Sequence, residues 1–411
     1  MEDEAEGGLD PAPDGPRSFD GQRGRGPYVR QDGRADGRHD ARRESHLESH
    51  HESHHGGGRD QARAAGEPRT TYAALDLGTN NCRLLVARPA GHAFRVIDAF
   101  SRIIRLGEGI SASGRISEAA IERAVAALSV CRDKMRHRHA GRARLIATEA
   151  CRAAQNGDEF HARILREVGL DLEIIDRKTE AALAATGCTP LIDPDAEGVI
   201  LFDIGGGSSE LVRLGPCAPT RRGPPAPRIE GWISIPLGVV TLAERYGGHE
   251  VSRAKFEAMI DEVAARIASF AAAHAGEVSR MHLLGTSGTV TTIAGVYLGL
   301  PRYDRRRVDG CWLDDGQVTG VVERLLAMSY DQRVDNACIG PERADLVLAG
   351  CAILEAIRRA FPCRRLRVAD RGLREGMLVE MMRADGVWDE PRTDPRAEPR
   401  AGPRAGPRAG P

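Results

Sequence analysis

Two glycine-rich segments constrain the fold of this chain more than any other feature of its sequence. Each begins with an aspartate at the end of an apolar run and leads into a second apolar run: Asp76–Asn80 reads DLGTN, and Asp203–Glu210 reads DIGGGSSE. Both predict a β-hairpin whose glycine turn exposes backbone N–H groups, which can surround phosphate oxygens. An aspartate beside such a turn can hold a hard cation that bridges those oxygens. The repetition predicts a phosphate chain held between two related halves.

Either turn alone could be an ordinary hairpin, because Gly, Asn and Asp favour tight reversals. The second turn is more informative, since three consecutive glycines cost conformational entropy that a plain hairpin does not require. The carboxylates of the two turns are candidate ligands of Mg²⁺, with substrate phosphate completing the shell, although Glu210 could be an exposed hairpin carboxylate. The hydroxyls of Thr79 and Ser208 could contact phosphate or only satisfy backbone groups. The candidate metal ligands are Asp76, Asp203 and Glu210.

Strand and helix patterns alternate through the rest of the chain in two similar rounds. The first round contains an amphipathic helix that opens at Ser117 and runs to about Arg136, followed by further alternating elements. The second round begins at the second glycine turn and ends in a helix over residues 374–383. This duplication predicts an α/β protein of two domains, residues 71–190 and 197–385, with a cleft between them.

Both ends of the chain have the composition of disordered segments. Residues 1–69 are rich in Gly, Arg, Asp, Pro and His, and residues 386–411 end in an Arg-Ala-Gly-Pro repeat. A Glu-Ser-His repeat over residues 44–54 could bind a transition metal if it were helical, and the alternative is a solvated low-complexity tract.

Composition argues against several classes of protein. The net charge is −1, so no basic field points to a nucleic-acid partner. The acidic N-terminus does not have the pattern of a signal peptide, and no apolar stretch is long enough to cross a membrane. Nine scattered cysteines without a C-x-x-C pair are typical of reduced thiols. We therefore expect a cytoplasmic protein.

Three further segments could line the cleft. Arg152 follows a strand, where its planar guanidinium could reach phosphate oxygens, although a solvated helical arginine is the alternative. Glu180 falls in the first turn of a helix, and on its chemistry alone it is no better a catalytic base than Glu149. The segment Gly285–Thr289 is a third strand-to-helix turn, which could be a plain turn or could offer free N–H groups to an anion. Its candidate phosphate ligands are Ser287, Gly288 and Thr289.

Taken together, these segments resemble the exopolyphosphatase and guanosine pentaphosphate phosphatase family, which belongs to the actin, Hsp70 and sugar-kinase superfamily. The resemblance runs from about Tyr72 to Met382 and is closest to the short form of the family, without the added helical domain of longer relatives. Single motifs recur across the superfamily, but the ordered set is specific. It comprises residues 76–80, 105–109, 147–156, 179–181, 203–210, 285–289 and 370–376.

The resemblance implies two RNase H-like domains of the actin-like ATPase type that face a central cleft. It implies that Glu180 activates the attacking water, that Asp203 and Glu210 lie near the metal, and that Arg152 contacts the phosphate chain. Two departures from the family pattern are Asn81, in place of a small hydroxyl residue, and Thr179, in place of a glutamate or glutamine. The two glycine turns supply the remaining phosphate-binding residues, Gly78, Thr79, Asn80, Gly205, Gly206, Gly207 and Ser208.

The resulting expectation is a Mg²⁺-dependent exopolyphosphatase that releases orthophosphate from the end of polyphosphate, with guanosine pentaphosphate as a weaker second substrate. Arg102, Arg105 and Arg152 could supply cationic contacts along a chain, and aromatic residues are only 4% of the sequence, so no guanine pocket is visible. A homodimer is plausible for this superfamily. Two alternatives are an ATP-dependent small-molecule kinase, against which the segment at Glu180 argues, and a non-catalytic alarmone-binding protein, against which the retained acids argue.

Overall fold

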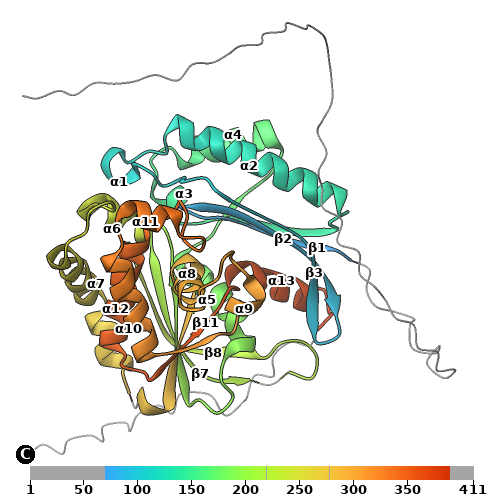
Figure 1. Ribbon diagram of the computed structural model, residues 1–411. Coiled ribbons are helices and arrows are strands. Elements are labelled where there is room, and N and C mark those ends of the chain that lie inside the picture. The colour runs from blue at the N-terminus through green and yellow to red at the C-terminus, as the bar shows by residue number, and fades with distance from the viewer. Residues whose placement is uncertain (1–69, 219, 277, 389–411) are drawn as a thin grey trace, which may run out of the picture. The chain divides into compact units, whose positions relative to one another are not determined.

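A computed structural model of the protein describes residues 70–218, 220–276 and 278–388, all within one compact unit of the chain (Figure 1). The two predicted tails, with the histidine repeat and the Arg-Ala-Gly-Pro repeat, lie outside the described residues. Among the helices of the described ranges, none is long and apolar enough to cross a membrane.

The first sheet has the strand order β3-β2-β1-β4-β5. The first three strands form an antiparallel meander, whereas β4 pairs with β1, and β5 with β4, in parallel. The turn between β1 and β2 is the first glycine turn, so the predicted hairpin is present. The strands are β1 Tyr72–Leu77, β2 Asn81–Ala90, β3 Ala93–Ile103, β4 Arg142–Ala147 and β5 Glu173–Ile174.

The second sheet repeats this plan with the order β10-β11-β9-β6-β7-β8. Its meander β6-β7-β8 contains the second glycine turn, and the parallel strands β9 and β11 follow β6, with the antiparallel β10 added at the edge. The predicted duplication is therefore confirmed. The strands are β6 Gly198–Ile204, β7 Ser209–Ala218, β8 Ala226–Ile235, β9 Met281–Thr286, β10 Trp312–Asp314 and β11 Arg365–Val368.

Helices α2 and α4 cover one face of the first sheet (Figure 1). The α2 helix begins after Ser117, whose hydroxyl accepts a hydrogen bond from the amide of Ala120 at 3.3 Å, and it buries a stripe of apolar side chains against the strands. The helices of this half are α1 Ile110–Ser113, α2 Glu118–His137, α3 Glu149–Ala153, α4 Gly157–Val168 and α5 Arg177–Cys188, with a 3₁₀ turn over Thr189–Leu191.

A larger apolar core joins the second sheet to the helices that cover it, with α12 packed against α7. The helix over residues 374–383 was predicted, whereas short helices such as residues 305–308 were not. The helices are α6 Val239–Tyr246, α7 Arg253–His274, α8 Ser287–Tyr297, α9 Arg305–Val308, α10 Asp315–Ala327, α11 Tyr330–Asp335, α12 Val347–Ala360 and α13 Leu373–Ala384, with a 3₁₀ turn over Val278–Arg280.

Two helices, α5 and α13, connect the two sheets. Side chains of α5 pack against strands of the second sheet, and α13 packs against β1 and β2 of the first sheet. The helices approach each other so closely that a Cβ on Gly376 would lie 2.0 Å from the carbonyl oxygen of Leu183, and one on Gly187 would lie 1.9 Å from the carbonyl oxygen of Gly372. This contact fixes α5, the helix that carries Glu180.

The folded core extends slightly beyond the predicted boundary at residue 385. Val387 and Trp388 are buried in the cluster that joins α13 to the first sheet. The indole Nε1 of Trp388 donates a hydrogen bond to the carbonyl of Gly91 at 3.1 Å, at the turn between β2 and β3. The last turn of the described chain therefore contributes to the core.

Candidate active site

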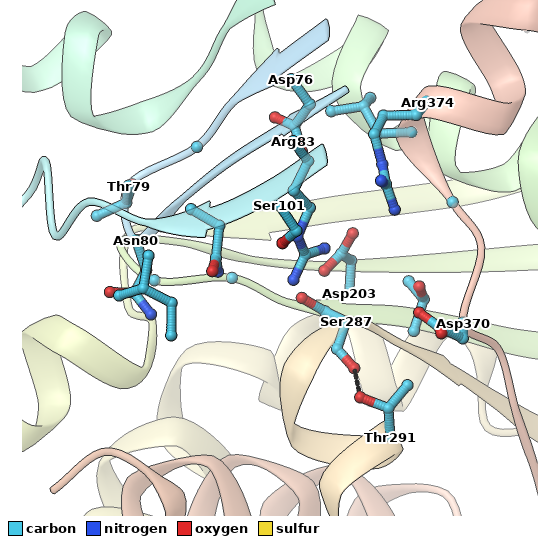
Figure 2. A pocket seen from close by; sticks show the side chains of 18 of the residues that line it. Asp76, Thr79, Asn80, Arg83, Ser101, Asp203, Ser287, Thr291, Asp370 and Arg374 are labelled. Carbon is cyan, nitrogen blue, oxygen red and sulfur yellow. Dashed lines mark hydrogen bonds between the residues drawn. The ribbon is translucent and has the colours of Figure 1, made fainter. Parts of the chain in front are cut away.

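The two glycine turns meet edge to edge. A Cβ on Gly206 would lie 3.0 Å from the Cβ of Thr79, and one on Gly207 would lie 2.9 Å from its hydroxyl oxygen, so side chains at these positions would force the turns apart. Beside the contact is a cavity of about 720 Å³ whose lining includes both turns (Figure 2). The two repeated segments thus line one cavity.

Each turn uses one glycine amide to close itself and leaves later amides available. Gly78 donates to the carbonyl of Asn81 at 2.9 Å, and Gly205 donates to the carbonyl of Ser208 at 3.0 Å. The following amides donate to no protein acceptor within the described residues, and such groups can bind an anion. They belong to Thr79 and Asn80 in the first turn and to Gly206, Gly207 and Ser208 in the second.

Among the carboxylates that line the same cavity are the predicted base and the three predicted metal ligands: Glu180, Asp76, Asp203 and Glu210. Burial raises the pKa of Asp203 to about 6 and that of Glu180 to about 7, and neighbouring carboxylates add to both shifts against opposing arginines. Burial also raises the pKa of Asp76, and it raises the pKa of Glu210 well above the ordinary value although Ser234 donates to that carboxylate at 2.7 Å. The cavity therefore disfavours additional negative charge unless a cation enters with it.

The carboxylates do not enclose a metal by themselves. Within the ranges that the structure describes, no three histidine, cysteine or carboxylate side chains are grouped closely enough to hold one ion. Mg²⁺ commonly takes only one or two carboxylates and completes its shell with water and phosphate oxygens. The hard oxygen donors at the ends of β1 and β6, Asp76 and Asp203, fit an ion of that kind held jointly with substrate.

Arg152 joins two carboxylates and does not line the cavity. Its Nη2 lies 2.7 Å from Oε2 of Glu149 and 2.9 Å from Oε2 of Glu180. Glu149 also receives Nη2 of Arg177 on its other oxygen at 2.7 Å. Glu149 is therefore neutralised by two guanidinium groups, whereas Glu180 is held by one. This difference separates the two glutamates that sequence reasoning left equal.

Five arginines that were not predicted as ligands line the cavity, and two of them, Arg305 and Arg371, are paired with carboxylates. Within the described part of the chain, the side chains of the other three, Arg83, Arg343 and Arg374, form no hydrogen bond or salt bridge with a protein acceptor. Figure 2 shows Arg83 and Arg374 extending into the cavity. Burial lowers the pKa of Arg374, which is the response expected of a desolvated cation. Arg83 lies opposite Asp76 in the β1–β2 register, so correct pairing of the hairpin would have found it.

The arginines expected along the cleft lie elsewhere. None of Arg102, Arg105 and Arg152 is in the cavity lining. The guanidinium of Arg102 lies 5.3 Å from the ring centroid of Phe100, and that of Arg105 forms a salt bridge with Asp345. Spacing in the sequence could not show these partners, because they depend on register and on distant segments.

The third turn contributes only in part. Ser287, in the left-handed region with φ +79°, lines the cavity and begins α8, where its carbonyl accepts a hydrogen bond from the hydroxyl of Thr291 (Figure 2). Gly288 and Thr289 are outside the lining, and Thr289 is buried.

The structure also shows the surroundings of the two residues that depart from the family pattern. The backbone amide of Thr179 donates a hydrogen bond to Asp176 at the start of α5. The Oδ1 of Asn81 is buried without a partner in the described structure.

Comparison with known families identifies the chain. The model of the Ppx/GppA phosphatase family matches residues 85–385. The chain belongs to this family. Exopolyphosphatase 2 of Mycobacterium tuberculosis is 28% identical over 331 residues, which cover 76% of this chain and 98% of that protein. A guanosine-5'-triphosphate,3'-diphosphate pyrophosphatase of Aeromonas salmonicida is 27% identical over 312 residues, covering 76% of this chain but only 59% of that longer protein.

Solved structures agree with this assignment. The Ppx/GppA family member of Aquifex aeolicus has a TM-score of 0.64 at 27% identity and covers 77% of this chain and 98% of its own. The structure of an exopolyphosphatase from Cytophaga hutchinsonii has a TM-score of 0.69 at 23% identity, covers 77% of this chain and 98% of its own, and supports the fold alone. The predicted family, phosphatase class and actin-like α/β fold are confirmed.

Proposed function

We propose that this Ppx/GppA phosphatase is a Mg²⁺-dependent exopolyphosphatase that releases orthophosphate from the end of a polyphosphate chain and takes guanosine pentaphosphate as a second substrate. The observation that carries the proposal is one cavity in which free turn amides and uncommitted arginines face a group of carboxylates. The names of the M. tuberculosis and A. salmonicida relatives support the two substrates. We also propose a cytoplasmic location, supported by nine free cysteine thiols.

The phosphate chain would be held by two kinds of donor. Amides of the two turns would bind oxygens of the terminal phosphate, since a concave set of N–H groups favours an anion. The guanidinium groups of Arg83, Arg343 and Arg374 would bind the following phosphates through paired N–H donors. Arg152, which lies outside the lining, would instead hold Glu180 in place.

Glu180 would act as the general base. A carboxylate with a pKa of about 7 can take a proton from water near neutral pH, and Arg152 fixes one of its oxygens at 2.9 Å. The site would also have to align the attacking water with the scissile bond, because hydrolysis of a phosphoanhydride needs an in-line nucleophile and a stabilised leaving phosphate. Bound Mg²⁺ would neutralise charge on the phosphate oxygens, and Asp76 and Asp203 would hold it, with Glu210 nearby.

Phosphate release by the purified full-length chain tests the proposal. Long-chain polyphosphate and guanosine pentaphosphate would be supplied separately, with Mg²⁺ and with a chelator. We expect release that requires the metal, and Asp203→Asn should raise the Mg²⁺ concentration that gives half-maximal rate. Asp158→Asn, at an exposed position on α4, is the matched control and should leave that concentration unchanged. Full activity in chelator would contradict the metal requirement.

A further inference from the structure

The loop after β3, residues 104–107, forms backbone hydrogen bonds with the first glycine turn. The amides of Ile104 and Arg105 both donate to the carbonyl of Asn80, at 2.9 and 3.1 Å, and the amide of Gly107 donates to the carbonyl of Thr79 at 2.8 Å. Arg105 adopts a left-handed backbone, with φ +46°, which is costly for a residue with a side chain. The loop therefore sets the orientation of the turn whose amides face the cavity.

The α6 helix holds the second glycine turn in the same manner. The amides of Val239 and Val240 donate to the carbonyls of Gly205 and Gly206, at 3.0 and 2.8 Å. Gly238, which precedes the helix, approaches so closely that a Cβ there would lie 2.4 Å from the backbone of Gly206. Each glycine turn thus has its own support: the loop after β3 for the first turn and α6 for the second.

Polar bridges join the loop after β3 to α6 and to the segment that precedes α12. The guanidinium of Arg105 forms two parallel hydrogen bonds with the carboxylate of Asp345, each 3.0 Å, and a third with the carbonyl of Glu342 at 3.1 Å. The amide of Gly109 donates to Glu244 on α6 at 2.9 Å. The side chains of Arg105 and Asp345 are 30% and 20% exposed, so the pair is partly shielded from water.

A second cavity, of about 730 Å³, lies between these supports, and the residues of both bridges line it. The loop and α6 are therefore not packed closely against each other at this cavity, and the polar bridges provide the contacts across it. Asp345 is also two residues beyond Arg343, the last residue of the segment 337–343 that lines the phosphate cavity. The Arg105–Asp345 pair consequently connects one wall of the phosphate cavity to the other.

We infer that Arg105 and Asp345, together with the Gly109–Glu244 hydrogen bond, form a clamp that fixes the spacing of the two phosphate turns before substrate binds. Arg105 is a positioning residue in this arrangement and contacts no phosphate. The inference rests on the proposed phosphate site. Without the clamp, only part of the population has both turns correctly spaced, and the apparent affinity for the phosphate chain falls in proportion to that fraction.

The experiment compares steady-state kinetics on long-chain polyphosphate for Arg105→Gln, Asp345→Asn and the double variant. The clamp predicts that each single variant raises KM about tenfold or more while kcat changes less than about threefold, since saturating substrate restores the spacing. The double variant should resemble the singles, because one missing partner already breaks the pair. Arg105→Lys should raise KM less than Arg105→Gln does, because lysine keeps the positive charge but cannot form the bidentate pair with Asp345.

Asp345→Asn separates the clamp from direct phosphate binding by Arg105. If Arg105 bound substrate, removal of its competing carboxylate would lower KM, which would overturn the inference. Loss of folded enzyme would lower kcat at unchanged KM, and that result would also overturn it. Arg359→Gln is the matched control: it removes an exposed bidentate pair with Glu257, between α12 and α7, and should leave KM unchanged.

Hydrogen exchange of the free protein gives a readout that does not depend on activity. Peptides that cover residues 104–107 and 239–240, whose amides donate to the carbonyls of the two turns, should exchange faster in Arg105→Gln and Asp345→Asn than in wild type, and Arg359→Gln should match wild type. Faster exchange in a protein that hydrolyses no polyphosphate would reject the proposed function and retain the clamp. Unchanged exchange and unchanged KM in an active enzyme would reject the clamp.

Discussion

Arg152 lies between two glutamates, yet its neighbours differ in their capacity to accept a proton. Glu149 is neutralised by Arg152 and Arg177, whereas Glu180 is paired with Arg152 alone. We predict that Glu180→Gln lowers kcat on the order of a hundredfold or more, the typical contribution of a general base. Glu149→Gln should cost less, because it loosens Arg152 without removing the base. Retention of more than about a third of wild-type turnover in Glu180→Gln would make Glu149 the better candidate.

The raised pKa of Glu180 predicts a pH dependence near neutrality. Burial raises this pKa from 4.5 to about 7, so the base is protonated and inactive in mildly acidic solution. We expect kcat/KM at fixed Mg²⁺ to fall about tenfold per pH unit below about pH 7. The same raised pKa affects stability in the opposite direction from activity. A carboxyl whose pKa is higher in the folded state than in the unfolded state stabilises the fold below pH 4.5, and this contribution is lost as the pH rises to about 7. An acid limb centred near pH 4.5 would contradict the assignment.

At the scale of elements, the placement of Glu180 depends on the contact between α5 and α13. Gly376→Ala would put a methyl group 2.0 Å from the carbonyl oxygen of Leu183, so the helices must separate. We expect a loss of about 1–3 kcal/mol in the free energy of unfolding, as for other overpacked cores, together with reduced kcat. Gly320→Ala is the control, because this exposed α10 position has nothing within 4 Å and alanine is the better helix former. Thermal or urea unfolding compares the two.

Elements with strong local patterns could be predicted from the sequence, and those set by distant contacts could not. The hairpin turns were found because glycine and aspartate specify them, and α2 because its apolar periodicity extends over many residues. Short elements such as α9 and β10 were missed, since three or four residues show no period. The same limit applies to the site: its carboxylates stand in recognisable turns, but Arg343 reaches the cavity only through the folded arrangement.

At the scale of the whole molecule, the described fold ends with Trp388, which is 2% exposed. The composition of residues 1–69 and 389–411 provides little apolar material for a core, so a chain of residues 70–388 should keep the turnover and melting temperature of the full protein. A chain that stops at Gly386 should melt several degrees lower, because loss of a buried tryptophan typically costs about 3–5 kcal/mol. Calorimetry and phosphate release on both chains check this. Equal melting temperatures for the two would contradict the role assigned to Trp388.

Substrate preference is decided by the cavity as a whole. Its uncommitted cations, Arg83, Arg343 and Arg374, suit a repeating anion, and its only aromatic lining residues within the described chain are Phe100 and Tyr303, which gives guanine little surface for stacking. We therefore predict a higher kcat/KM for long-chain polyphosphate than for guanosine pentaphosphate under one set of conditions. A value more than about tenfold higher for guanosine pentaphosphate, about 1.4 kcal/mol of transition-state binding, would reverse the assignment. Arg374→Gln should also affect the two substrates differently. It should lower kcat/KM for polyphosphate more than for guanosine pentaphosphate, because the longer phosphate chain contacts more of the arginines that line the cavity.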